Sequence, residues 1–289
     1  MGEKLVRNDF AVFILSNNRA NSVRTLDTLL KENYTGKYYI IIDNEDKQID
    51  DYYNKFGKEH IIVFDKQKKA SDCDTFDNLD KRNTVLFARN SCHEIAKSLG
   101  LKYFLELDDD YNIFRFRFSN GQKLISMEVM DMDSIINSML EFLEVSGVLT
   151  VAFSQTGDFI GGIGSTIYTE RIIRKAMNAF FCKTSRPFKF IGRMNDDINT
   201  YVNLGSKGNL FLTIADICLE QGSTQQNSGG LTDMYLELGT YVKSFSTVLC
   251  NPSSVSISII GTRFKRIHHN INWKTTVPEI ISDRFKVKE

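Results

Sequence analysis

The chain has 289 residues, with 36 Lys and Arg balanced by 36 Asp and Glu, and 42% hydrophobic residues. Its 21 Phe and 11 Tyr carry too much apolar surface for a disordered chain, and the balanced charge argues against a nonspecific nucleic-acid coat protein. Five cysteines without CxxC spacing argue against a zinc ribbon or a disulfide framework and favour a reducing cytoplasm. No apolar run is long enough to span a membrane.

Up to residue 110, the sequence alternates between patterns typical of strands and of helices. Continuous apolar runs predict strands at residues 10–15, 38–42, 60–64 and 103–107. Apolar residues at helical spacing predict helices at about 23–30, 49–56 and 82–98. This alternation predicts an α/β fold in which helices flank a mostly parallel sheet. The polar stretch 65–81 is expected to be a charged surface loop.

Beyond residue 111 the pattern changes. Residues 113–118 alternate apolar and basic side chains and lead into Asn120-Gly121, a strong hairpin turn signal. The spacing then predicts a helix at 131–145 and a strand at 147–153. Since no proline-rich linker separates the halves, we expect a single domain over residues 1–289.

Polar clusters follow three of the first four predicted strands. They are Ser16–Arg19, Asp43 with Asn44, and Asp108–Asp110. In open α/β sheets, ligands bind in the crevice outside the carboxyl ends of the strands. We therefore expect these three clusters to meet at one edge of the sheet and to form a binding site.

The three adjacent carboxylates of Asp108, Asp109 and Asp110 repel one another, so they favour either a bound cation or a solvated turn. Hard divalent ions such as Mg²⁺ or Mn²⁺ prefer oxygen ligands and bridge protein carboxylates to substrate phosphates. In an extended chain Asp108 and Asp110 point to the same side. They are the better metal-binding pair, with Asp109 turned away or used on a sugar hydroxyl.

Three segments carry a resemblance to known enzymes. Residues 13–19 (FILSNNR), 88–90 (ARN) and 105–110 (LELDDD) resemble GT-A fold glycosyltransferases and, more narrowly, the TET-associated glycosyltransferases of phages. The likeness covers the first 110 residues well and the remainder loosely. It implies a GT-A-like single domain, with a nucleotide-sugar-binding half at 1–110 and an acceptor-side half at 111–289. It also implies the addition of sugars to hydroxymethylated or oxidised pyrimidines in DNA.

The resemblance implies a role for each matching residue of the donor site. Ser16 and Arg19 would touch the nucleotide, and Asp43 would read the edge of a uracil ring. Arg89 would make a basic contact to the nucleotide, and Asp109 is a further candidate for nucleotide-sugar binding. Asp108 and Asp110 would hold Mn²⁺ or Mg²⁺ and, through it, the diphosphate.

A histidine and a second pair of acids are further candidates. Many metal-dependent GT-A enzymes bring a late histidine to the ion, and His268 is preferred here over His269; both could instead be exposed in a basic tail. Asp197 or Asp196 would take the proton of the acceptor hydroxyl in an inverting reaction. Acids at a helix start could also serve only as caps, with Asn195 as the capping residue.

Two basic stretches could bind the acceptor. Between residues 171 and 193, seven basic residues are interleaved with Phe and no acid occurs. Lys and Arg neutralise phosphates, while aromatic rings stack on bases. The residues predicted to contact DNA are Arg186, Lys189, Arg193, Arg263, Lys265 and Arg266. The alternative for 171–193 is an amphipathic helix with a basic outer face and a Phe core.

The sequence as a whole predicts a metal-dependent enzyme that moves a sugar from a UDP-sugar to hydroxymethylated cytosine in double-stranded phage DNA. It would act in the cytoplasm, that of the host if phage-encoded, without a membrane partner. Transfer to a glycan, lipid or protein remains an alternative. A nucleotidyltransferase, which also sets carboxylates and Mg²⁺ against a nucleotide, and a noncatalytic nucleic-acid-binding module are others.

Overall fold

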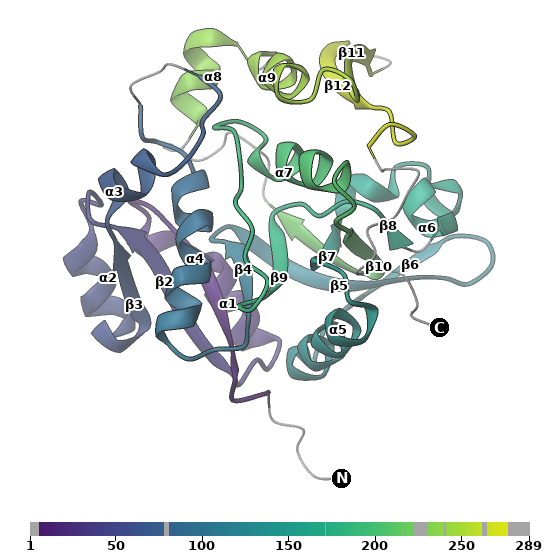
Figure 1. The fold of residues 1–289 in the computed structure, drawn as a ribbon. Coiled ribbons are helices and arrows are strands. Elements are labelled where there is room, and N and C mark those ends of the chain that lie inside the picture. The colour runs from purple at the N-terminus through teal and green to yellow at the C-terminus, as the bar shows by residue number, and fades with distance from the viewer. Residues whose placement is uncertain are drawn as a thin grey trace, which may run out of the picture.

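The computed structural model describes residues 6–77, 81–170, 172–221, 231–239, 241–261 and 265–276. A large mixed β-sheet forms its centre (Figure 1). The strands lie across it in the order β3 (Ile61–Phe64), β2 (Lys37–Asp43), β1 (Phe10–Leu15), β4 (Tyr103–Asp108), β9 (Ala179–Lys183), β7 (Thr150–Gln155), β10 (Phe211–Gln221), β5 (Tyr111–Ser119) and β6 (Leu124–Glu128). The short β8 (Ile172–Ile173) pairs with β10.

The strands of the N-terminal half are parallel, as expected from the strand–helix alternation. The other half adds antiparallel pairs, because β9 runs opposite to β4 and β7, and β5 runs opposite to β10 and β6. The predicted α/β class is confirmed, and parallel pairing prevails only in the N-terminal half. Both halves contribute to one sheet, joined where β4 pairs with β9.

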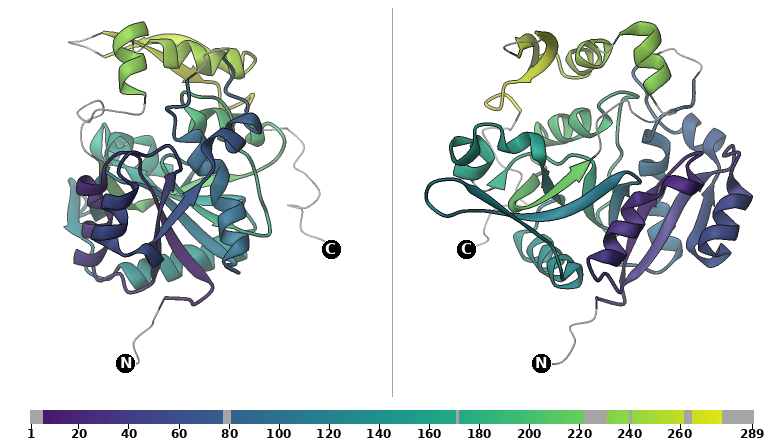
Figure 2. Two further views of the ribbon diagram at one scale, coloured as in Figure 1. Left: turned by 90° about the vertical axis from the view of Figure 1, so that its left-hand side faces the viewer. Right: turned by 180° about the vertical axis from the view of Figure 1, so that it is seen from behind.

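Helices cover both faces of the sheet (Figures 1 and 2). The helices on one face are α1 (Arg24–Lys31), α2 (Ile49–Phe56) and α5 (Met132–Ser146), and those on the other are α3 (Lys66–Ser71), α4 (Leu86–Ser98) and α7 (Asp196–Gly205). Alternation along β1 sends Val12 and Ile14 to the first face and Phe13 to the second. Each such fully buried side chain contributes roughly 1.5–3 kcal/mol.

The last described segments form a separate layer, which we call the C-terminal module. It comprises α8 (Thr232–Leu238), α9 (Val242–Cys250), β11 (Val255–Ile260) and β12 (Arg266–Ile271). The module lies over α7 in all three views (Figures 1 and 2). Tyr201 of α7 stacks on Trp273, which follows β12, with ring centres 5.9 Å apart.

The remaining elements are short. They are α6 (Thr166–Glu170) and the 3₁₀ turns η1 (Ala20–Ser22), η2 (Lys58–His60), η3 (Thr156–Phe159) and η4 (Gly162–Gly164). None of the helices in the described parts of the chain has the length and hydrophobicity that a membrane span requires.

Two sequence-based expectations were wrong. The stretch 65–81 is not simply a loop, because Asp65 caps α3 by accepting a hydrogen bond from the backbone of Lys68. The alternative of an amphipathic helix at 171–193 also fails. Phe180 and Phe181 lie in β9 and are fully buried on opposite faces of the sheet, so these two Phe residues belong to a strand buried on both sides.

Candidate active site

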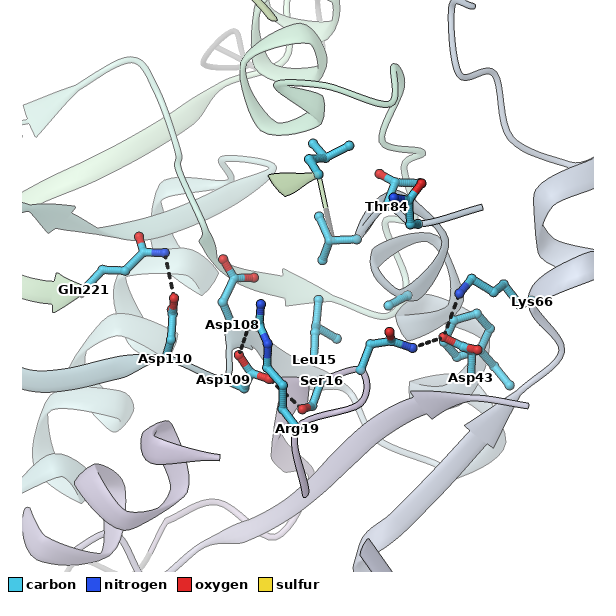
Figure 3. Close-up of a pocket in the computed structure, with 16 residues that line it drawn as sticks. Leu15, Ser16, Arg19, Asp43, Lys66, Thr84, Asp108, Asp109, Asp110 and Gln221 are labelled. Carbon is cyan, nitrogen blue, oxygen red and sulfur yellow. Dashed lines mark hydrogen bonds and ion pairs between the residues drawn. The ribbon is translucent and has the colours of Figure 1, made fainter. Parts of the chain in front are cut away.

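The carboxyl ends of β1 and β4 form one wall of a cavity of about 310 Å³ (Figure 3). These strands are paired in parallel with Leu15 opposite Asp108. The strand order reverses between β1 and β4, since β2 and β3 extend the sheet on one side and β4 on the other. Such a reversal is the usual ligand crevice of an α/β sheet. The cavity brings together Ser16, Arg19, Asp43 and the triplet Asp108–Asp110, as expected.

The middle carboxylate of the triplet holds the turn after β1. Asp109 accepts a hydrogen bond from Ser16 Oγ at 2.5 Å and forms an ion pair with Arg19 Nη1 at 2.9 Å (Figure 3). The hydroxyl of Tyr52 in α2 lies 2.7 Å from Ser16 Oγ and accepts the backbone N–H of Arg19 at 3.0 Å. Asp109 and Tyr52 therefore position Ser16 and Arg19 at the cavity.

The first carboxylate, Asp108, is held from the other side of the sheet. Arg89 of α4 lies 3.3 Å from Asp108 through Nη2 and 2.7 Å from Asp196 through Nη1. Arg89 is buried, does not line the cavity, and packs over the rings of Phe180 and Phe190. A buried position outside the cavity does not fit the predicted contact between Arg89 and the nucleotide. Arg89 positions Asp108 instead.

Burial and the negative charges of Asp110 and Asp109 raise the pKa of Asp108 to about 7, although Arg89 opposes the shift. Asp110 accepts a hydrogen bond from Gln221 at 3.3 Å through Oδ2, while its buried Oδ1 has no hydrogen-bond partner in the described chain. A cation would satisfy this oxygen and offset the repulsion between the carboxylates. Asp108 and Asp110 thus fit a divalent ion.

Among the described residues, no third His, Cys, Asp or Glu forms a metal-binding group together with Asp108 and Asp110. Mg²⁺ commonly uses only one or two carboxylates and completes its shell with water and substrate phosphates. The pair therefore suits a metal that binds together with a diphosphate.

Asp43, at the end of β2, lies at the other end of the cavity (Figure 3). Its Oδ2 accepts hydrogen bonds from Asn17 at 2.7 Å and from the buried ammonium of Lys66 at 3.2 Å. Its Oδ1 accepts the backbone N–H of Glu45 at 2.9 Å. Each carboxylate oxygen has two lone pairs, so one acceptor position of Asp43 is left for a ligand.

The two acids at the start of α7 differ in their contacts. Both are buried, but Asp196 is engaged by Arg89. Among the contacts with the described residues, Asp197 Oδ1 accepts the backbone N–H of its neighbour Ile198, and Asp197 forms no ion pair with Arg89. Burial and the charge of Asp196 raise the pKa of Asp197 to about 6. Asn195 precedes the helix, but its side chain does not cap it.

The histidine expected to complete the metal site lies elsewhere. His268 belongs to β12 and its ring lies 4.2 Å from that of His269. Neither lines the cavity of Asp108 and Asp110. Local sequence patterns do not indicate where this late segment packs, and the structure places it over α7 in the C-terminal module.

Two of the predicted DNA contacts, Arg193 and Arg186, lie in or near the fold's interior. Arg193 is 2% exposed and forms an ion pair with Asp77 at 2.7 Å. Arg186 donates hydrogen bonds to the backbone oxygens of Gly147 and Val148. Both therefore hold loops together and do not face an acceptor. The exposed Lys189 donates to a backbone oxygen at 3.3 Å.

The second basic stretch lies at the surface where the structure describes it. Lys265 and Arg266 are exposed at the start of β12. Arg263 lies outside the described residues.

Sequence reasoning missed Lys66, Tyr52 and Gln221. Lys66 could have been found from the strand pairing. Parallel β2 and β3 place Asp43 opposite Phe64. Lys66 follows two residues later, so it lies at the same edge of the sheet as Asp43. Tyr52 carries no comparable signal, since its helix pattern does not reveal where the hydroxyl points. Gln221 lies at the end of a strand that was not predicted.

Solved structures with a related fold share little sequence with this chain. A mycobacterial protein is 9% identical, with 91% of this chain and 83% of that chain covered and a TM-score of 0.47. Glucosyl-3-phosphoglycerate synthase from Mycobacterium tuberculosis, solved with Mg²⁺ and UDP, is 8% identical, with coverage of 91% and 87% and a TM-score of 0.45. GalNAc-T7, solved with UDP, GalNAc and Mn²⁺, is 12% identical, with coverage of 76% and 44% and a TM-score of 0.42.

Among curated proteins, no sequence matches the chain. The sequence model of the TET-Associated Glycosyltransferase family matches residues 10–230. This match spans most of the chain, including β1, β4 and α7, and confirms the predicted enzyme class. The chain belongs to the TET-associated glycosyltransferase family.

Proposed function

We propose that this glycosyltransferase moves a sugar from a UDP-sugar to hydroxymethylated cytosine in double-stranded phage DNA, with Mn²⁺ or Mg²⁺ as cofactor. One observation carries the donor assignment: Asp108 and Asp110 share a single cavity with Arg19 and Asp43. The cavity thus has an acidic end suited to a metal diphosphate and a second polar end suited to a base. The family match sets aside the nucleotidyltransferase and the noncatalytic binding module.

The edge of the base would bind against the pair formed by Asp43 and Lys66. Lys66 presents a donor 3.2 Å from the acceptor oxygen of Asp43. Uracil carries a carbonyl oxygen beside an N–H on its edge and complements this pair, whereas the corresponding edge of cytosine has the opposite polarity. Leu15, Val85 and Ala88 line the same cavity and supply apolar contacts for the ring. This arrangement supports a uridine nucleotide.

The diphosphate would lie at the other end of the cavity. Arg19 contributes a guanidinium held by Asp109, and Ser16 holds Asp109 in place by donating its hydroxyl to that carboxylate. Asp108 and Asp110 would hold the divalent ion, which supplies positive charge to a leaving diphosphate when bound. Arg89 fixes the carboxylate of Asp108 for this purpose.

For an inverting transfer, Asp197 is the proposed general base, ahead of Asp196. Asp196 is occupied by Arg89, whereas Asp197 has an oxygen available and a pKa near neutrality. The acceptor oxygen attacks the anomeric carbon while its proton passes to Asp197. The bond between that carbon and the diphosphate oxygen breaks, and UDP leaves with the bonding electrons.

DNA is proposed as the acceptor on the strength of the family and of the exposed Lys265 and Arg266 in the C-terminal module. The hydroxymethyl group must reach a buried carboxylate, so the base would be flipped out of the duplex. All five cysteines are free, which agrees with action in the reducing cytoplasm of a host cell.

The test supplies radiolabelled UDP-sugar and Mn²⁺ with duplex DNA that contains either hydroxymethylcytosine or cytosine. The proposal predicts label only in the modified duplex and a glycosylated nucleoside in the mass spectrum of its digest. Equal labelling of both duplexes, or labelling of neither, would overturn the DNA acceptor. Transfer to an added glycan, lipid or protein would identify the alternative.

A further inference from the structure

A second group of charged side chains lies outside the donor cavity, in the C-terminal module. This module lies over α7 (Figure 1). Lys243 is in the first turn of α9, and Arg266 and His268 lie on β12. None of the three lines the donor cavity. Asn195 fastens the module here, since its amide donates hydrogen bonds to the backbone oxygen of Lys243 at 3.1 Å and to Thr247 Oγ1 at 2.9 Å.

Positive charge gathers in this group without a paired acid. Within the described chain, neither Lys243 nor Arg266 forms an ion pair. Burial and the charge of Arg266 lower the pKa of Lys243, and burial, Arg266 and Lys243 lower the pKa of His268. The first turn of α9 adds the positive end of a helix dipole. Cations held together without a counter-charge repel one another, and a bound anion would relieve that repulsion.

The group lies beside the proposed general base. The ammonium of Lys243 is 5.8 Å from the ring centre of Tyr235 in α8. Asn195, whose amide donates to the backbone oxygen of Lys243 at 3.1 Å, is two residues before Asp197, and the charge of Asp197 raises the pKa of Lys243 against its burial. An anion held by Lys243 would therefore lie next to the carboxylate that receives the acceptor's proton.

We propose that Lys243, Arg266 and His268 bind a backbone phosphate of the acceptor strand, adjacent to the nucleotide that receives the sugar. This inference rests on the proposed DNA acceptor. A flipped nucleotide stays attached to its flanking phosphates, so a cationic group beside the proposed general base Asp197 is where such a phosphate would arrive. The ammonium, guanidinium and imidazole provide the donors for its oxygens.

The family match does not extend over the C-terminal module. The match ends at residue 230, whereas the C-terminal module begins at Thr232. Donor residues such as Asp108 lie within the matched segment, and Lys243, Arg266 and His268 lie beyond it. The phosphate site is thus built from the part of the chain that is outside the shared family sequence.

The test measures binding of a fluorescent duplex containing hydroxymethylcytosine by anisotropy over a range of salt concentrations. Lys243→Met and Arg266→Gln should each weaken binding roughly tenfold and reduce the slope of log K against log salt by about 0.9. Lys243→Arg should restore wild-type binding, because it keeps the charge. Lys97→Met removes the same charge from the exposed far end of α4 and should leave binding unchanged. Thermal unfolding shows whether each variant is folded.

Wild-type binding and salt slopes in folded Lys243→Met and Arg266→Gln would overturn the phosphate site while leaving the proposed function intact. Equal weakening by Lys97→Met would overturn it too, since the effect would then be nonspecific. If Lys243→Met and Arg266→Gln lose affinity for inorganic phosphate but bind the duplex as the wild type does, the site takes the free ion and not the strand. Failure of the wild type to label modified DNA would instead remove the proposed acceptor, and this inference with it.

Discussion

Arg89 and Asp196 form a buried ion pair of 2.7 Å, although they are 107 residues apart in the sequence. The same guanidinium reaches Asp108 at 3.3 Å. One cation thus links the end of β4, where the donor would bind, to the start of α7, where the acceptor hydroxyl would be deprotonated. The two carboxylate sites therefore share one ion-pair partner, Arg89, which does not line the donor cavity.

Replacing Arg89 with Met should destabilise the fold and abolish transfer. Removing one partner of a buried ion pair typically costs about 3–5 kcal/mol, because the remaining charge is left without compensation. Thermal or urea unfolding measures the loss. A variant as stable as the wild type that fails only to bind UDP would show that Arg89 contacts the nucleotide directly.

Asp197→Asn should reduce sugar transfer by about 10²- to 10⁴-fold, because the amide cannot take up the hydroxyl proton. UDP affinity should remain, since Asp197 does not line the donor cavity. Steady-state transfer kinetics and calorimetric UDP binding measure the two effects. Asp27→Asn makes the same chemical change at an exposed position on α1 and serves as the control. Full activity in Asp197→Asn would contradict the assignment of Asp197 as the general base. A product that retains the anomeric configuration would contradict it as well.

The pH dependence of kcat/KM follows from the same residue. Burial and the charge of Asp196 raise the pKa of Asp197 to about 6. A base must be deprotonated to act, so kcat/KM should fall as the pH decreases through about 6. Asp196→Asn removes one cause of the raised pKa and should move this acidic limb to lower pH. An acidic limb that stays in place in Asp196→Asn would contradict the assignment.

Lys66→Met should remove the preference for UDP over CDP. The variant loses the donor that complements a carbonyl oxygen on uracil, and a hydrogen bond to a charged group accounts for roughly tenfold or more in affinity. Competition binding with UDP and CDP measures the ratio. Lys97→Met provides the charge-matched control. Equal affinity of the wild type for UDP and CDP would show that Asp43 and Lys66 do not read the base.

The sequence predicts the donor half well because its signals are local. Continuous apolar runs locate β1 to β4 within a few residues, and parallel pairing then brings Ser16, Asp43 and Asp108 to one edge. These placements need only the strand order and the direction of each strand. The contacts of Asp109 with Ser16 and Arg19 need side-chain geometry, which no spacing rule provides.

The acceptor half was harder to predict because its contacts join distant segments. Arg193 reads as an exposed DNA contact, yet it is buried against Asp77, 116 residues earlier. His268 reads as a metal ligand, but the packing of β12 beside α9 keeps it out of the donor cavity. Neither outcome follows from local periodicity, since each depends on which distant element the segment packs against.

The most direct test of the donor site is calorimetric titration of UDP with and without Mn²⁺, in the wild type, Asp110→Asn and the control Asp27→Asn. A metal held by Asp108 and Asp110 predicts that Mn²⁺ strengthens UDP binding in the wild type and in the control. It also predicts that this gain disappears in Asp110→Asn, which loses a ligand charge. UDP binding that is the same with and without Mn²⁺ in the wild type, or a full gain in Asp110→Asn, would contradict the carboxylate-metal site.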